Sequence, residues 1–253
     1  MLALLPLAVQ GQTKETFAFV QRDSTLYLDV WRPAHPRPDS ACVIALFGGG
    51  FVVGERDNEL QSTIARQLTE RGFVVVSPDY RLGFKDTAHI AQYKGVSGLQ
   101  DMFQWVIDIA TEDCAAACAW VIAHADMLDV STSRIILTGS SAGAIAVLQL
   151  DYCRANAMPQ AASLPTGWMP AAVVPYSGGI MCKGKPHWAT PPAPTMLMHG
   201  TKDKIVAYKR FPPLLRHAQW GADIVYKRMT RQGFPTWIVR YEGIGHEVAS
   251  FLP

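Results

Sequence analysis

One serine lies in a pattern that fits a nucleophile. Residues 134–147 read RIILTGSSAGAIAV, an apolar run followed by a Gly-x-Ser-x-Gly turn around Ser141 and then by small residues. A serine at a sharp strand-to-helix turn presents its Oγ at the edge of a sheet, close to the first backbone N–H groups of the helix. The segment therefore predicts Ser141 as a nucleophile. On this segment alone, the alternative is a glycine and serine turn without chemistry.

Three adjacent glycines follow a second apolar run. Residues 42–54 read CVIALFGGGFVVG, which is typical of a strand buried on both faces that ends in a glycine loop. Successive N–H groups without side chains in the way can stabilise an anion that develops on a carbonyl oxygen, at about 3 kcal/mol per donor. The alternatives are a mobile turn and a phosphate loop. The phosphate loop fits poorly because Gly48-x-Gly50-x-x-Val53 lacks its third glycine.

Two later strands end in loops that carry an acid and a base. The run at 195–199 leads to Asp203, and the run at 236–241 leads to a glycine-rich loop with His246. Because the carboxyl ends of parallel strands meet at one edge of a sheet, Ser141, Asp203 and His246 are expected to converge there. Each of the last two alone is more typical of a surface or capping residue. Together, in the order Ser, Asp, His, the three predict the catalytic triad of an α/β-hydrolase.

With these segments, the chain resembles small bacterial carboxylesterases of the α/β-hydrolase superfamily. The group includes acetyl xylan esterases, feruloyl esterases and hormone-sensitive-lipase-like esterases, and the resemblance runs from Asp23 to His246. It implies that Ser141 is the nucleophile, His246 the general base and Asp203 its orienting acid. It also implies an oxyanion hole formed by three backbone N–H groups, those of Gly49, Gly50 and Ala142.

The same resemblance gives roles to neighbouring residues. It implies that Asp79, Tyr80 and Arg81, in the segment Ser77–Leu82, support the oxyanion loop and take no direct part in catalysis. Many relatives have histidine before the three glycines, where this chain has Phe47. Because the donors are backbone groups, this departure bears on positioning and specificity and not on the type of reaction.

The elements that must position these residues alternate along the chain. We expect a hairpin at 15–21 and 25–31, strands at 42–47, 73–77, 134–138, 171–176, 194–199 and 236–241, and helices at 58–71, between 96 and 127, after Ser141 and at 209–232. This alternation predicts one α/β domain at 13–253, with a mostly parallel sheet covered by helices on both faces. Segments 156–170 and 180–193 are too short for a large cap. Phe47, Phe51 and Trp188 are the candidate residues of a substrate pocket.

Charge, cysteines and the first residues bear on the partners, the metal content and the location of the protein. The net charge is +2 without a basic run, which gives no indication of nucleic acid or of an anionic membrane surface. Five cysteines cannot all pair, and Cys114 and Cys118 lie four apart on an expected helix, which fits core residues better than a metal site. The apolar residues 1–12 are too short to span a bilayer and resemble the remnant of a signal peptide, which favours a secreted or periplasmic protein over a cytoplasmic one.

The sequence thus predicts a serine esterase without a cofactor or metal, acting on short-acyl or aryl esters. Acetyl and feruloyl groups on plant polysaccharide are candidate substrates, and the oligomeric state stays open. The alternatives are an amidase or exopeptidase with the same triad, and a binding protein that has kept the fold without catalysis.

Overall fold

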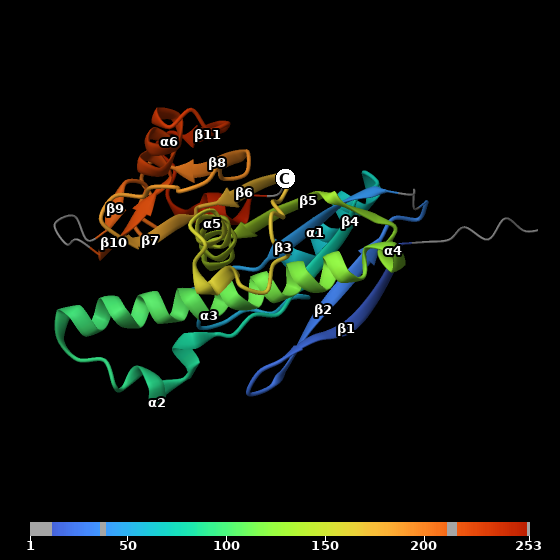
Figure 1. Ribbon diagram of the computed structural model, residues 1–253, viewed down its shortest axis with the longest axis horizontal. Helices are drawn as coiled ribbons and strands as arrows, with labels where there is room; N and C mark the ends of the chain where they lie inside the picture. The colour runs from blue at the N-terminus through green and yellow to red at the C-terminus, as the bar shows by residue number, and fades with distance from the viewer. Residues whose placement is uncertain (1–11, 36–38, 212–216, 252–253) are drawn as a thin grey trace, which may run out of the picture.

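The computed structural model describes residues 12–35, 39–211 and 217–251. Apart from Gln12, the expected signal-peptide remnant lies outside these residues. The chain is wound around an eight-stranded sheet in the order β1-β2-β4-β3-β5-β6-β8-β11. Figure 1 labels these strands. The expected hairpin is present as β1 (Thr13–Gln21) and β2 (Thr25–Arg32), and β2 pairs antiparallel with β4 (Val74–Pro78).

The rest of the sheet is parallel. It consists of β3 (Ser40–Leu46), β5 (Val130–Ser140), β6 (Ala172–Tyr176), β8 (Thr195–Gly200) and β11 (Thr236–Tyr241). The register runs without a break from β8 to β11, where Leu197 lies opposite Ile238. The carboxyl ends of β5, β8 and β11 therefore lie along one edge of the sheet, as the strand pattern predicts.

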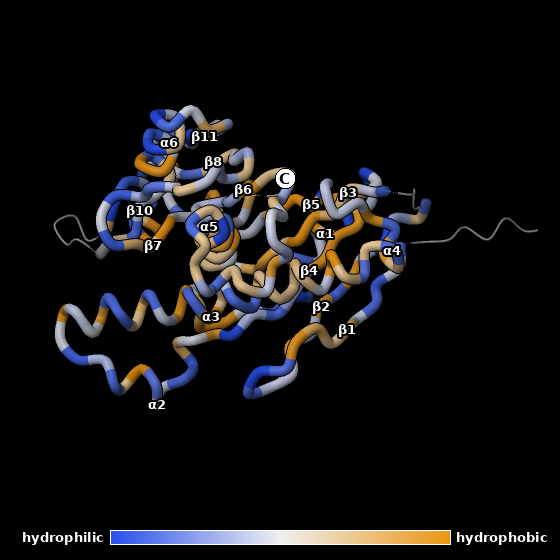
Figure 2. The backbone as a smooth tube through the Cα atoms, viewed as in Figure 1, coloured by the Kyte–Doolittle hydropathy of each residue, from blue (hydrophilic) through white to orange (hydrophobic). Residues whose placement is uncertain are grey.

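Helices cover both faces of the sheet because its central strands are apolar on both sides. On β3, Cys42, Ile44 and Leu46 belong to a core shared with α3 (Gly95–Ala123) and α5 (Ala142–Ala155). Val43 and Ala45, which point to the other face, pack with α1 (Glu59–Glu70). Figure 2 shows the central strands of the sheet as largely apolar.

Helix α3 is longer than the sequence pattern indicates. In place of several helices between 96 and 127, the structure has one helix of 29 residues and the short α4 (Ala125–Leu128). Its second half packs in the core and buries the predicted pair Cys114 and Cys118, which are free thiols like the other three cysteines. Its first half projects past the sheet beside η1 (Gly83–Lys85) and α2 (Thr87–Ile90) (Figure 1).

The expected helix at 209–232 is wrong in its first part. Residues Arg210–Phe211 form β9 and His217–Gly221 form β10, and only Ala222–Arg231 are helical, as α6. These strands join β7 (Gly179–Lys183) in a second, antiparallel sheet of three strands. The pairing of β10 with β7 joins segments almost 40 residues apart, which local periodicity cannot reveal.

The absence of a large cap agrees with the sequence. Segment 156–170 contains only η2 (Pro159–Ala161), and 180–193 contributes β7. The last element among the described residues is η3 (His246–Ser250). Within the described ranges, no helix has the length and apolar character needed to cross a membrane.

Candidate active site

Ser141 lies on the turn between β5 and α5. Its backbone has φ 50° and ψ −113°, a region that residues with a side chain rarely adopt. Its N–H donates to the carbonyl oxygen of Tyr176 at 2.9 Å. A Cβ on Gly143 would come within 2.4 Å of the Leu46 carbonyl oxygen, so only glycine lets α5 start this close to the end of β3. Local packing therefore fixes the strained turn that holds Ser141.

His246 joins the serine to the acid. Its Nε2 lies 2.9 Å from the Ser141 Oγ, and its Nδ1 lies 2.8 Å from Oδ2 of Asp203. The three residues come from the loops after β5, β8 and β11. Ser140, the spacer of the Gly-x-Ser-x-Gly pattern, donates its hydroxyl to the carbonyl oxygen of Ala249 in η3. This bond ties the segment that begins with His246 to the strand that ends at the serine.

Asp203 is buried and strongly hydrogen bonded. Burial alone would raise the pKa of this carboxyl group, but hydrogen bonds from His199, His246 and the Ile205 N–H hold its pKa well below the usual range. Oδ1 accepts from the N–H groups of Ile205 and Val206 at 2.9 and 3.0 Å. The acid is thus an ionised carboxylate at any pH near neutral, with Oδ2 directed at His246.

The glycine loop lies beside the serine. A Cβ on Gly48 would come within 3.3 Å of the Ser141 Cβ. Gly49 has φ 129°, and a Cβ there would meet the Val53 carbonyl oxygen at 1.9 Å. Within the described residues, the N–H groups of Gly49, Gly50 and Ala142 donate to no other group of the protein. Three backbone donors thus remain available next to Ser141.

Tyr80 fixes the start of this loop. Its hydroxyl donates to the carbonyl oxygen of Phe47 at 2.8 Å, and its ring stacks on the Phe47 ring at 4.3 Å. The Phe51 ring packs edge-on against the same tyrosine. Burial raises the pKa of Tyr80 far above its usual range, so the hydroxyl stays protonated. Phe47 is therefore part of the loop's support.

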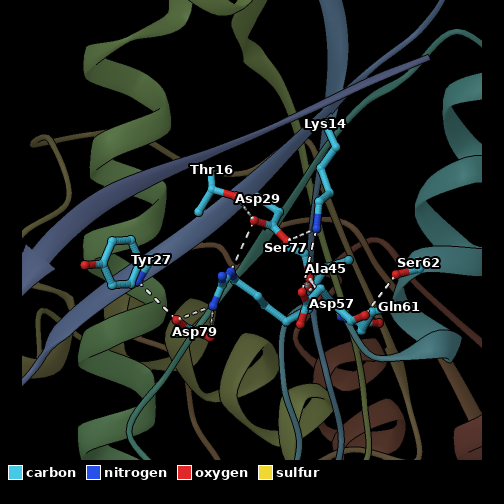
Figure 3. A network of polar contacts seen from close by, with 11 residues as sticks. Lys14, Thr16, Tyr27, Asp29, Ala45, Asp57, Gln61, Ser62, Ser77 and Asp79 are labelled. Carbon is cyan, nitrogen blue, oxygen red and sulfur yellow. Dashed lines mark hydrogen bonds and ion pairs between the residues drawn. The ribbon is translucent and has the colours of Figure 1, made fainter. Parts of the chain in front are cut away.

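Arg56 fixes the other end of the loop. Its guanidinium pairs with Asp79 at 2.9 Å and with the fully buried Asp29 at 3.2 Å, and its carbonyl oxygen accepts from Ser77 (Figure 3). Burial would lower the pKa of Arg56, but these two carboxylates raise it. Lys14 donates to Oδ2 of Asp29, and Thr16 donates to Oδ1, the oxygen that also accepts from Arg56.

Asp29 and Arg56 were not predicted from the sequence. A charged residue in the middle of the apolar strand LYLDVW was the available signal for Asp29. Asp79 pairs with Arg56 at the end of the glycine loop, and Tyr80 contacts Phe47 at its start. Arg81 instead binds Asp113 and Glu112 on α3, away from the loop.

An apolar cavity of about 230 Å³ opens beside Ser141. Its walls include Gly50, Phe51 and Ala142 from the predicted site. The other lining residues come from α3 and its approach, from α5, and from the second sheet and the loop before it: Phe84, Leu99, Gln100, Phe103, Ile107, Ile145, Met181, Ile205, Val206, Phe211 and Gln219.

Two of the three predicted pocket residues do not line this cavity. Trp188 is 3% exposed and packs edge-on against Tyr152 and Phe234 in the core. Phe47 lies behind the glycine loop against Tyr80. Phe51 alone of the three forms part of the wall. Large apolar side chains are most often core residues, and only tertiary packing decides which of them face a cavity.

A family model decides the classification. The BD-FAE model matches residues 28–156, which are half of the chain. The chain belongs to the BD-FAE family. The match runs from β2 through α5 and includes the glycine loop and Ser141. Asp203 and His246 lie outside the matched range. Their place beside Ser141 is given by the contacts of His246 with both residues.

Other comparisons point to esterases and lipases. Lipase 2 of Moraxella sp. strain TA144 is 35% identical over 107 residues, which are 42% of this chain and 20% of that protein. Esterase LipI of Mycobacterium tuberculosis is 31% identical over 114 residues, 45% of this chain and 29% of that protein. The chain thus spans less than a third of either relative.

Solved structures extend the likeness to the whole fold. Esterase 2 of Thermogutta terrifontis, phosphoramylated by tabun, superposes with a TM-score of 0.64 at 18% identity, over 96% of this chain and 88% of that one. Its butyrate-bound form gives a TM-score of 0.63. At this identity the likeness establishes the fold, and the protein has the α/β-hydrolase fold.

Proposed function

We propose that this protein is a serine carboxylesterase with Ser141, His246 and Asp203 as its triad. The observation that carries the proposal is the unbroken series of short contacts from the Ser141 Oγ through both ring nitrogens of His246 to the Asp203 carboxylate. Nucleophile, base and orienting acid in this geometry are what acyl transfer through a covalent intermediate needs. The named activities of the relatives support the same class of reaction.

In the proposed cycle, His246 takes the Ser141 proton while Oγ attacks the ester carbonyl carbon. Asp203 fixes the imidazole tautomer and stabilises the imidazolium that forms. The N–H groups of Gly49, Gly50 and Ala142 stabilise the negative oxygen of the tetrahedral intermediate. His246 then protonates the departing alcohol, and the same histidine activates a water molecule that releases the acid.

The shape of the cavity supports an ester with a compact apolar group. A cavity of about 150 Å³ lined by Leu, Ile and Phe is large enough for benzene, so 230 Å³ holds an aromatic ring with a short side chain or a short to medium acyl chain. Neither segment 156–170 nor segment 180–193 builds a cap over it, which leaves room for an alcohol part as large as a sugar chain. We therefore propose short-acyl and aryl esters, with acetyl and feruloyl groups on plant polysaccharide as natural candidates.

The proposal is tested with matched substrates. We expect the wild type to hydrolyse p-nitrophenyl butyrate at least 100-fold faster, in kcat/KM, than the corresponding p-nitroanilide, and S141A to hydrolyse neither. Faster cleavage of the anilide would make the protein an amidase. No hydrolysis of any acetyl, butyryl or feruloyl ester by the wild type would favour a binding protein without catalysis.

The polysaccharide substrates and the location of the protein are tested separately. Release of acetate or ferulate from acetylated or feruloylated xylan tests the polysaccharide substrates, and hydrolysis of small esters without such release would contradict them. Export from the cytoplasm remains a prediction from residues 1–12 alone. Fractionation of a bacterial host that expresses the full chain tests it.

A further inference from the structure

A second histidine shares the carboxylate of Asp203 with His246. His199 lies at the end of β8 and is fully buried. Its Nε2 is 3.3 Å from Oδ2 of Asp203, the same oxygen that lies 2.8 Å from His246, and 2.9 Å from the carbonyl oxygen of Val206. One ring nitrogen of His199 thus faces two acceptors on the turn that carries the acid.

The contacts of His199 set its tautomer. The Val206 carbonyl oxygen and the ionised Asp203 oxygen can only accept, so Nε2 must carry the proton and donate to both. Nδ1 is buried and has no hydrogen-bond partner within the described ranges, so a proton there would have no acceptor. The ring packs edge-on against Tyr208 at 5.6 Å, which further limits its rotation. His199 is therefore held as a fixed single donor.

Each carboxylate oxygen of Asp203 faces two donors. Oδ1 accepts from the N–H groups of Ile205 and Val206, and Oδ2 accepts from His246 and His199. Three of these four donors are fixed by the fold, and only His246 takes part in proton transfer. The three fixed donors determine the plane of the carboxylate and aim Oδ2 at Nδ1 of His246.

We infer that His199 is a positioning residue for the esterase reaction, which acts on His246 and Ser141 through the Asp203 carboxylate. The inference rests on the proposed function. It assigns His199 two effects: it orients the acid, and it takes up part of the negative charge on Oδ2. Loss of its N–H misaligns the acid and leaves more negative charge facing His246.

The test compares three substitutions of His199 that keep or remove the donor. In H199Q the amide N–H reaches about as far as Nε2, whereas in H199N the same amide is one methylene shorter. H199L has no donor. We expect H199Q to keep kcat within about threefold, and H199N and H199L to lower kcat about tenfold with KM within about twofold. If H199L does not fold, as judged by its thermal unfolding midpoint, the H199Q and H199N pair decides.

The pH profile separates positioning from a purely structural role. Added negative charge on Oδ2 favours protonated His246, so the acid limb of kcat/KM in H199L should move to higher pH by about half a unit. When H199L is added to D203N, kcat should fall by less than about twofold further, because no carboxylate is left to position. Equal losses in both backgrounds with an unmoved acid limb would overturn the inference. So would wild-type kcat in H199L, or a loss in H199Q as large as in H199N.

A readout without an ester keeps this inference separate from the proposed function. The rate at which a fluorophosphonate labels Ser141 reports activation of the serine by His246, and the variants should fall in the same order. If the wild type is labelled but hydrolyses no ester, the proposed function fails, and the labelling rates still decide on His199. A wild type that is not labelled overturns both.

Discussion

Asp203 accepts from two histidines and two backbone N–H groups, and this environment keeps it ionised. In D203N one oxygen becomes an amide nitrogen, which cannot accept from His246 and favours the wrong imidazole tautomer. We expect kcat to fall by about four orders of magnitude while the fold is kept. Steady-state kinetics on p-nitrophenyl butyrate measures this.

The matched control for D203N is E242Q. Glu242 is an exposed acid on the neighbouring loop that accepts from Thr201 and does not contact His246. Its substitution should leave kcat within about twofold. Near-normal turnover in D203N together with a severe loss in E242Q would show that the acid is misassigned.

Asp108 on α3 gives a prediction about stability. Burial raises the pKa of its carboxyl group from 3.8 to about 6, against hydrogen bonds from Gln104 and Gln160 that lower it. The folded state therefore holds this proton more tightly than the unfolded state does. The resulting stabilisation is present below pH 3.8 and is lost as the pH rises to about 6.

D108N removes this dependence on pH. Relative to the wild type, the variant should gain about 1 kcal/mol in free energy of unfolding between pH 4 and pH 7.5, because the group is partly exposed and solvent weakens the effect. Urea unfolding of both proteins at the two pH values measures the gain. A stability difference that is the same at both would contradict the prediction.

At the residue scale, the sequence predicted more of the chemistry than of the pocket. Ser141, Asp203 and His246 could be picked out because each follows an apolar strand, and the structure brings their side chains together. Trp188 could not be separated from a core residue, because its type and neighbours are the same in both cases. Asp29 and Arg56 could not be predicted, because their ion pair joins residues 27 positions apart and forms only in the packed sheet.

At the scale of elements, the first half of α3 forms one wall of the cavity beside Ser141. Leu99 and Phe103 line the cavity and are 52% and 42% exposed, and Phe103 packs edge-on against Phe84. The periodicity of 95–123 indicates a helix but gives no sign that its first half extends beyond the sheet.

This wall should select the acyl chain. We expect F103A to lower kcat/KM about tenfold for octanoyl and feruloyl esters, since apolar contact worth about 1.4 kcal/mol is lost, and to change acetate hydrolysis less than about twofold. The control is V96A, a smaller truncation to alanine on the same helix at a side chain that is 66% exposed and outside the cavity. Equal losses on acetate and octanoate in F103A, or a selective loss in V96A, would exclude this wall as the acyl site.

The second sheet shows why some elements could not be predicted. Strand β10 pairs with β7, and the chain between them includes β8 and the Asp203 loop. Gly221 ends β10 and is the N-cap of α6, at a point where a Cβ would lie 1.8 Å from the Ala207 carbonyl oxygen. The sequence signals a helix near this point, but the strand before it pairs with β7 and β9, which its own residues do not reveal.

At the scale of the whole molecule, the parallel sheet explains how residues more than 100 positions apart form one site. The order β5-β6-β8-β11 puts three strand ends in a row, and the turns after them carry the serine, acid and base. Alternation of apolar strands with helices was enough to predict this architecture. The BD-FAE match agrees for the first half of the chain, and the second half depends on the fold alone.

The most direct test of the account is the position of a covalent adduct. The wild type is treated with a fluorophosphonate and digested, and mass spectrometry locates the modified residue. We expect one adduct, on Ser141, formed in parallel with the loss of ester hydrolysis and absent in S141A. An adduct on Ser140 or Ser177, or full hydrolysis by S141A, would contradict the assignment of Ser141 as the nucleophile.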